Sequence, residues 1–206
     1  MNSTRSKAAV FSLVAAAVFL AGCGATRPSK YYQLTIPGEA PAGQNVEAAP
    51  VTLLVGTLLA PDLYRESRIV YSTTGEQMGT YEYERWEEPP TEMIQEVLLR
   101  ELRSSGRYRA VFVHRSDANG DFLLRGRLYD FKEVSGNGEV ARLTADFEMR
   151  DMKNGATVWT HYYHYDEPVN GKDVPAVVAA LDKNVQRAVK EVLESLNQYF
   201  AAHPVK

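Results

Sequence analysis

The chain has little cysteine, little histidine and no excess of positive charge. Cys23 is the only cysteine, so no disulfide can form within the chain and stability must come from core packing. Lys and Arg number 23 against 26 Asp and Glu, which does not suit nucleic-acid binding. The four histidines are scattered, and no G-x-S-x-G, H-E-x-x-H or P-loop spacing is present. The sequence therefore predicts no nucleic-acid partner, no catalytic residue, no metal and no cofactor.

The chain also lacks an apolar run long enough for a retained membrane-spanning helix. Residues 8–21 are apolar except for Ser12, and they follow the positively charged Arg5 and Lys7. This run has 14 residues. Crossing the hydrocarbon core of a bilayer takes roughly 20. The pattern is typical of an export signal that is cleaved, and we expect residues 1–22 to be removed.

The end of this run carries the most specific motif of the sequence. Leu20-Ala21-Gly22-Cys23 looks like the lipobox of bacterial lipoproteins, in which the cysteine is acylated and becomes the first residue. The alternative is a chance cysteine beside an ordinary cleavage site, which would leave a lone thiol in an exported protein. Acyl burial contributes about 0.8 kcal/mol per CH₂, so three chains on Cys23 would hold the protein on a membrane. Gly24 is not the Asp that retains such lipoproteins at the inner membrane, which favours the outer membrane, facing the periplasm.

The remaining 184 residues are enough for one domain with a hydrophobic core. Without Arg5 and Lys7 they contain 21 basic and 26 acidic residues, a formal net charge of −5. We interpret residues 23–30 as a short lipidated tether and residues 31–206 as the folded domain. Strands are predicted at 30–36, 51–59, 67–73, 77–85, 108–113, 121–134, 139–151 and 156–166.

Two amphipathic helices complete the predicted domain. The first spans about residues 90–105, begins at Pro90 and ends before Gly106. The second follows Asp173, which we expect to cap it, and has Pro175 in its first turn. Strict alternation in residues 139–151 predicts a strand with one buried and one solvated face. The fold class is α/β or α+β, with a mixed, mostly antiparallel sheet and both helices packed on it. The pairing around the first helix stays open between parallel and antiparallel.

Aromatic side chains are the remaining candidates for function. Tyr81, Tyr83 and Trp86 crowd the end of one predicted strand, and Trp159 and Tyr163 share a face of another. One interpretation is packing under a helix and between strands. The other is a contact surface for a partner or a lipid, because Tyr and Trp are enriched at such sites. These five residues are the candidate contacts.

An ordered set of segments resembles the ABC-type transport auxiliary lipoproteins, the PqiC-like family. After the lipobox, the matching segments are Tyr31-Tyr32-Gln33-Leu34, residues 51–56, Ile69-Val70-Tyr71, Tyr83, Trp86-Glu87-Glu88-Pro89-Pro90, Ser105-Gly106, residues 121–126 and Phe131. The resemblance covers nearly the whole mature chain. It departs at Tyr199-Phe200, where a Trp is expected.

This resemblance implies a role, a fold and a set of partners. The role is the non-enzymatic outer component of an MCE-type transport system, which moves phospholipid or other hydrophobic molecules between two membranes. The partners implied are an MCE-domain protein and its ABC transporter components, with the outer membrane contacted through acylated Cys23. The fold implied has three layers, and one hypothesis is a homo-oligomeric collar. The alternative function is an envelope-integrity or outer-membrane assembly lipoprotein without a transport partner.

Overall fold

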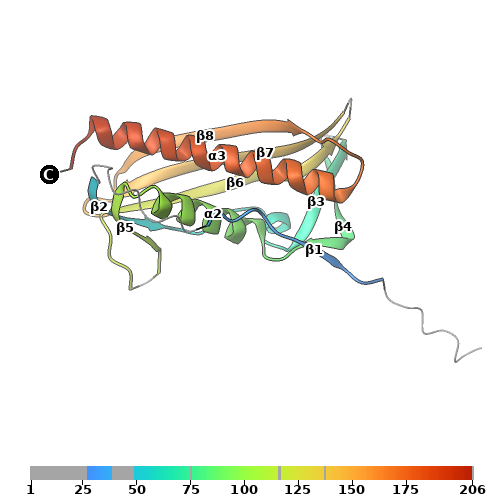
Figure 1. Cartoon of the computed structure of the whole chain (residues 1–206), viewed down its shortest axis with the longest axis horizontal. Coiled ribbons are helices and arrows are strands. Elements are labelled where there is room, and N and C mark those ends of the chain that lie inside the picture. Colours follow the sequence, from blue (N-terminus) through green and yellow to red (C-terminus); the bar gives the residue numbers. More distant parts are fainter. Residues whose placement is uncertain (1–26, 39–48, 75, 116, 137, 206) are drawn as a thin grey trace, which may run out of the picture.

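The computed structural model describes residues 27–38, 49–74, 76–115, 117–136 and 138–205. They form one sheet with two helices against it (Figure 1). The elements are β1 (Lys30–Tyr32), β2 (Ala49–Val55), the 3₁₀ turn η1 (Asp62–Tyr64), β3 (Arg68–Thr74), β4 (Gln77–Trp86), α2 (Pro90–Ser104), β5 (Tyr108–Val113), β6 (Phe122–Ser135), β7 (Glu139–Asp151), β8 (Thr157–Pro168) and α3 (Val174–Ala202).

The long strand β6 organises the sheet. On one side it pairs along its whole length with β7, which pairs in turn with β8, so the predicted antiparallel meander is confirmed. On its other side β6 is long enough for two parallel partners, with β2 beside Phe122–Leu124 and β3 beside residues 132–134. The antiparallel ladders are the longest, and the parallel pairings β1–β4, β2–β5, β2–β6 and β3–β6 make the sheet mixed.

The sequence left open whether the strands before and after the first helix pair in parallel or antiparallel. The structure shows that they do not pair with each other. The strands before and after α2 are not neighbours, because the order along the sheet is β1-β4-β3-β6-β2-β5. Instead β4 lies between β1 and β3, and β5 pairs in parallel with β2 at the far edge. The connection through α2 therefore spans most of the sheet.

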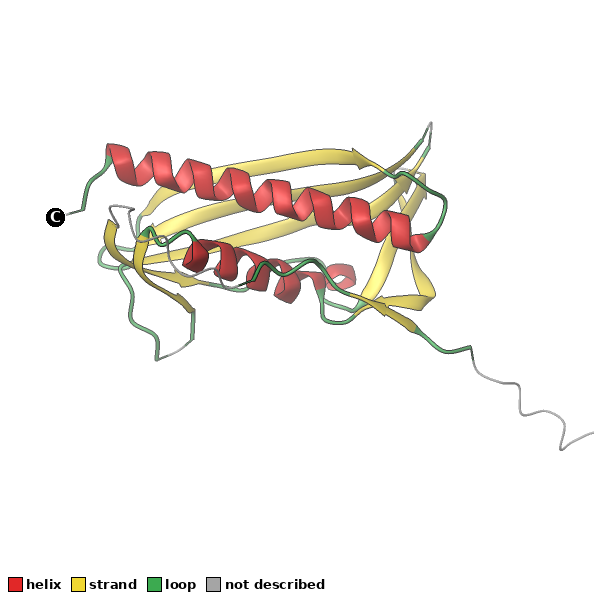
Figure 2. Cartoon of the chain, viewed as in Figure 1, coloured by secondary structure: helices red, strands yellow, loops and turns green. Residues whose placement is uncertain are grey.

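Both helices lie on the same face of the sheet and contact each other (Figure 2). The described residues thus form two layers, which corrects the three-layer arrangement implied by the resemblance. The physical reason is the alternation along β7. One face is apolar and fully buried, whereas the opposite face carries charged and polar residues and has no helix among the described residues. The buried residues of β7 are Ala141, Leu143, Ala145, Phe147 and Met149.

Local sequence signals determine where the helices begin and end. The Asp173 side chain accepts the backbone N–H of Ala176 at 3.1 Å, so it caps α3 as predicted. Pro90 occupies the first turn of α2. Gly106 ends that helix with φ 63°, a conformation that side chains with a Cβ rarely adopt.

Two predicted strands are shorter than expected. β1 ends at Tyr32 instead of residue 36, because Leu34 enters the core with 1% of its surface exposed. β2 ends at Val55 instead of residue 59, and Leu59 returns to the sheet only as an isolated bridge to Arg127. In both cases a continuous β-prone sequence leaves the ladder, because tertiary contacts decide where strand pairing stops.

Candidate functional site

The predicted lipid-attachment residue, Cys23, lies outside the described residues. The described chain begins at Arg27 and enters the sheet at Lys30, which pairs with Glu84 of β4. Glu84 accepts hydrogen bonds from the Tyr32 hydroxyl at 2.6 Å and from Lys30 Nζ at 3.3 Å. The hydrogen bond from Tyr32 holds the pKa of Glu84 below its usual value. The end of the tether is therefore attached to the edge of the sheet.

The segment after β1 is attached to α3 as well. Asp182 of α3 accepts the backbone N–H of Thr35 at 2.9 Å and the Thr35 hydroxyl at 2.7 Å. Gln186 donates its side-chain amide to the Thr35 carbonyl at 2.8 Å. With Leu34 buried beside these contacts, residues 30–35 bind both layers of the fold. The chain leaves the body at a fixed corner, away from the C-terminal end of α3 (Figure 1).

Two of the five aromatic candidates lie under α3. The Trp159 indole N–H donates to the Ser195 hydroxyl at 3.0 Å, and Trp159 is 9% exposed. The Tyr163 hydroxyl donates to Asn184 Oδ1 at 2.6 Å, and burial raises the pKa of Tyr163 to about 12. Both side chains join the sheet to the helix, so the structure places them in the helix–sheet core.

The other three candidates lie on β4 and differ in exposure. Trp86 is 1% exposed and packs against Phe131, with ring centroids 5.4 Å apart. Tyr81 is half-buried and donates to Glu133 at 2.6 Å, and burial raises its pKa above the usual value. Tyr83 is half-buried beneath the guanidinium of Arg27, 5.3 Å from the ring centroid. The structure does not gather the five residues into one site.

Asn184 is a buried residue that sequence reasoning missed. It lies in the apolar stripe of α3, and none of its surface is exposed. Its side-chain N–H groups donate to the carbonyls of Ala141 and Tyr165, each at 3.0 Å, and its oxygen accepts from Tyr163. One side chain thus satisfies polar groups on two strands. The only signal in the sequence was an amide on the apolar face of a helix.

Glu167 lies at the end of β8, where a charged side chain is ordinarily expected to be solvated. The structure instead buries it to 4% exposure beneath α3, where it pairs with Lys183 and, at 2.9 Å, with Arg187. The hydrogen bond from Lys183 lowers the pKa of Glu167. The Arg187 guanidinium also lies over the Tyr165 ring, 3.8 Å from its centroid. This cluster attaches the N-terminal half of α3 to the edge strand.

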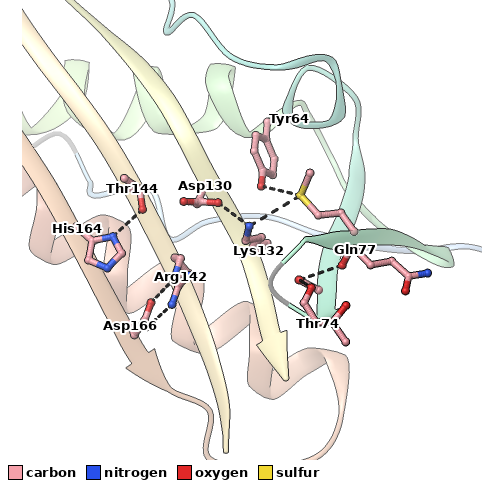
Figure 3. Close-up of polar contacts among 11 residues, drawn as sticks. Tyr64, Thr74, Gln77, Asp130, Lys132, Arg142, Thr144, His164 and Asp166 are labelled. Carbon is pink, nitrogen blue, oxygen red and sulfur yellow. Dashed lines mark hydrogen bonds and ion pairs between the residues drawn. The ribbon is translucent and has the colours of Figure 1, made fainter. Parts of the chain in front are cut away.

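The face of the sheet opposite the helices, called here the open face, carries a network of cross-strand polar pairs (Figure 3). Arg142 of β7 binds Asp166 of β8 through two hydrogen bonds of 2.7 Å. Thr144 and His164 form the next pair at 2.8 Å. On β6, Lys132 forms an ion pair with Asp130 at 2.6 Å. These groups satisfy one another, so this part of the open face is a structural surface.

Farther along the open face lies a shallow cavity of about 400 Å³, lined mostly by charged and polar residues that include Arg125, Arg127 and Glu148. Leu59 and Tyr162 line it and are 58% and 64% exposed. Tyr129 nearby is 43% exposed, and its hydroxyl donates to Asp146 at 2.5 Å. Gly126 lies in the floor, where an added Cβ would come within 2.6 Å of the Asp146 carbonyl oxygen. Here exposed apolar side chains thus lie among fixed polar ones.

Potential metal ligands are not clustered in the part of the chain that the structure describes. Among the described residues, no group of three His, Cys, Asp or Glu side chains could hold a metal ion. His161 and His164 project from opposite faces of β8. His161 Nε2 lies 3.8 Å from a Glu191 oxygen, beyond hydrogen-bond distance. In the described part of the chain, no helix has the length and apolar character needed to cross a membrane.

Together, these features describe a two-layer domain of sheet and helices whose N-terminal segment is fixed at one corner. The sequence model of the family described as the ABC-type transport auxiliary lipoprotein component matches residues 32–193, and the chain belongs to this family. Membership makes it an auxiliary lipoprotein of ABC-type transport, a family not known for enzymes, and agrees with a membrane-anchored place in the cell envelope.

Solved structures share the fold. Protein XCC0632 from Xanthomonas campestris is 19% identical with a TM-score of 0.70, over 80% of this chain and 92% of that one. An uncharacterized protein is 14% identical with a TM-score of 0.66, and the match covers 82% of this chain and 99% of that protein. Protein CT253 from Chlamydia trachomatis is 10% identical with a TM-score of 0.53, and the match covers 75% of this chain and 100% of that protein. No curated protein matches the sequence.

Proposed function

We propose that this lipoprotein is the docking and receiving component of an MCE/ABC-type intermembrane system for phospholipid or other hydrophobic molecules. The observation that carries the proposal is the family match over residues 32–193, which covers most of the core that the structure describes. The fixed exit of the tether supports it. A body attached to its membrane at one corner presents its remaining surfaces in a defined direction.

The proposal includes the membrane and the division of the chain. Residues 1–22 are the cleaved signal, residues 23–30 the lipidated tether and residues 31–206 the domain. Acylated Cys23 anchors the protein in the outer membrane with the body in the periplasm, as Gly24 after the cysteine favours. The partners are an MCE-domain protein and its ABC transporter components.

For the docking surface we propose the apolar part of the open face, around Leu59 and Tyr162. Both side chains are more than half exposed, and they lie beside the cavity described above. Tyr and other large apolar groups provide most of the binding energy at protein interfaces. Tyr81 and Tyr83 remain predicted contacts at the end near the anchor, whereas burial of Trp86, Trp159 and Tyr163 gives those residues a role in packing.

The test is co-purification of the acylated protein from detergent with the MCE protein of the same genome. We expect the Leu59→Ala/Tyr162→Ala double variant to capture at least about tenfold less partner, since loss of roughly 1.4 kcal/mol lowers an association constant tenfold. Phe112→Ala is the matched control, because Phe112 is 51% exposed on a different strand. We expect it to capture the partner like the native protein.

Two results would count against this function. Failure of the native acylated protein to bind an MCE protein at low salt would reject the docking role. Normal lipid transport in a deletion strain would favour the envelope-integrity alternative. Equal capture by the double variant and the native protein would reject only the assignment of the surface.

A further inference from the structure

A row of two arginines and a tyrosine crosses three strands at the corner where the tether leaves the body. Tyr31 of β1 is in register with Arg85 of β4, and Arg85 is in register with Arg68 of β3. Residues in register share a face of a sheet. Tyr31 is 64% exposed and Arg68 is also exposed, so the row is a surface feature. We call Tyr31, Arg68 and Arg85 the corner row.

The two arginines of this row are not paired with carboxylates in the described part of the chain. In the described ranges, neither Arg68 nor Arg85 has a carboxylate oxygen within 4.0 Å. The adjacent carboxylate, Glu84, is bound by Lys30 and Tyr32 instead. Strand alternation turns Arg85 away from Glu84 and from the buried Trp86. Like charges directly opposite each other in a ladder are destabilising. An anion bound between Arg68 and Arg85 would therefore reduce the repulsion between the two guanidinium groups.

The length of the tether determines which anion lies within reach. Four residue-to-residue steps separate Cys23 from Arg27, the first described residue. Fully extended, they span at most about 13–14 Å. Arg27 itself lies over the Tyr83 ring of β4, three residues before Lys30 enters the sheet beside that strand. The corner row is therefore confined close to the bilayer surface that holds the acyl chains.

We propose that the corner row binds the phosphate groups of anionic lipid headgroups in the leaflet that holds the anchor. This inference rests on acylation of Cys23, and it adds a second, electrostatic membrane contact to the covalent one. Guanidinium groups bind phosphate oxygens in bidentate geometry. Tyrosine suits the interface between headgroups and acyl chains. Such a contact prevents the body from turning about its tether, so that the open face keeps one orientation to the membrane.

The first test measures whether lipid phosphates shield these arginines. The acylated protein, with acylation verified by mass, is placed in nanodiscs of phosphatidylcholine alone or mixed with phosphatidylglycerol. Phenylglyoxal then modifies accessible guanidinium groups, and mass spectrometry gives the rate at each arginine. We expect anionic lipid to slow modification of Arg68 and Arg85 roughly fivefold each. Arg107, near the C-terminal end of α3, should be modified equally in both lipids, and high salt should remove the difference.

The second test uses a double variant. Backbone hydrogen exchange in residues 30–32 should slow in anionic nanodiscs for the native protein. It should not slow for Arg68→Gln/Arg85→Gln. The matched control is Arg107→Gln/Lys153→Gln, which removes two exposed charges far from the corner and should behave like the native protein. Equal thermal unfolding of the variants in detergent shows that the substitutions leave the fold intact.

The outcomes separate the two proposals. Equal modification of Arg68 and Arg85 in both lipids, or slowing that extends equally to Arg107, would overturn the lipid contact. Exchange that slows in the Arg68→Gln/Arg85→Gln variant as in the native protein would overturn it too. Because no transport partner is present, failure to bind an MCE protein leaves these measurements unchanged. Absence of acylation by mass would overturn both the anchor and this inference.

Discussion

At the scale of single residues, the buried polar groups explain the contact between α3 and the sheet. Asn184 and Glu167 are both buried, and both bind partners across the layer boundary. Buried polar groups that are fully paired define one alignment of packed elements, because any shift would leave them unsatisfied. The aromatic residues Trp159 and Tyr163 contribute to the same boundary.

Replacing Asn184 by Ala should destabilise the protein by about 2–4 kcal/mol. The substitution removes the side-chain donor to the carbonyls of Ala141 and Tyr165 and leaves the Tyr163 hydroxyl only the longer, 3.3 Å contact with the backbone carbonyl of residue 184. Chemical denaturation measures the change in the free energy of unfolding. Gln198→Ala, at an exposed position of the same helix, should stay within about 0.5 kcal/mol of the native protein. If Asn184→Ala changed the free energy of unfolding as little as Gln198→Ala, Asn184 would not be needed to hold α3 on the sheet.

Glu167 should make stability depend on acidic pH. Its pKa is lowered in the folded protein by the hydrogen bond from Lys183, so the stabilisation is present above the unfolded pKa of about 4.3. It is lost as the pH falls through the folded pKa. Glu167→Gln should therefore cost about 1.5–3 kcal/mol at neutral pH and flatten the acid limb of a plot of unfolding free energy against pH. Glu87→Gln, exposed and outside the cluster, is the control. If the unfolding free energy of Glu167→Gln fell in acid as steeply as that of the native protein, Glu167 would not be the group that causes the loss of stability.

At the scale of elements, the N-terminal segment is attached more firmly than its sequence indicates. The β-prone residues 30–36 were expected to form one strand, but only Lys30–Tyr32 pair with β4. The following residues bind α3 instead, because Asp182 and Gln186 offer partners for the backbone of Thr35. No pattern within residues 30–36 carries this information. The partners lie about 150 positions away, as the separation of 151 between Thr35 and Gln186 shows.

Asp182→Ala should release this segment while leaving the body folded. The Thr35 N–H loses its acceptor, so its hydrogen exchange should accelerate roughly tenfold or more, the effect of losing an interaction of about 1.4 kcal/mol. Exchange along β7 should not change. Glu194→Ala, exposed on the same helix, provides the comparison. Unchanged exchange at Thr35 would mean that burial of Leu34 alone holds the segment.

At the scale of the whole molecule, the protein is a two-layer body with one attached corner and one solvated sheet face. The helices cover the apolar face, and the open face keeps a polar network beside an exposed apolar area. We propose that these two features give the anchored lipoprotein an orientation and a docking surface. Both depend on the tether, since an unanchored body would have no preferred direction.

The anchor gives the whole-molecule prediction. Cys23→Ser removes the thiol that would carry the acyl chains, so the protein should no longer take up labelled palmitate or show the mass of an acylated product. Ser29→Ala in the same tether should be acylated like the native protein. An unmodified Cys23 on a secreted, soluble product of the native gene would contradict the anchor and the docking role that depends on it.

The sequence by itself determined the elements, because period, caps and turn residues act over short distances. The alternation in β7, the cap at Asp173 and the glycine at 106 each define a local conformation, and all three are confirmed. The resemblance likewise identified the family. Tertiary structure alone decided that both helices share one face, that β4 and β5 lie apart, and that Trp86, Trp159 and Tyr163 are buried. The physical reason is that strand order and burial arise from contacts between distant segments, and no local period records which segment covers which face.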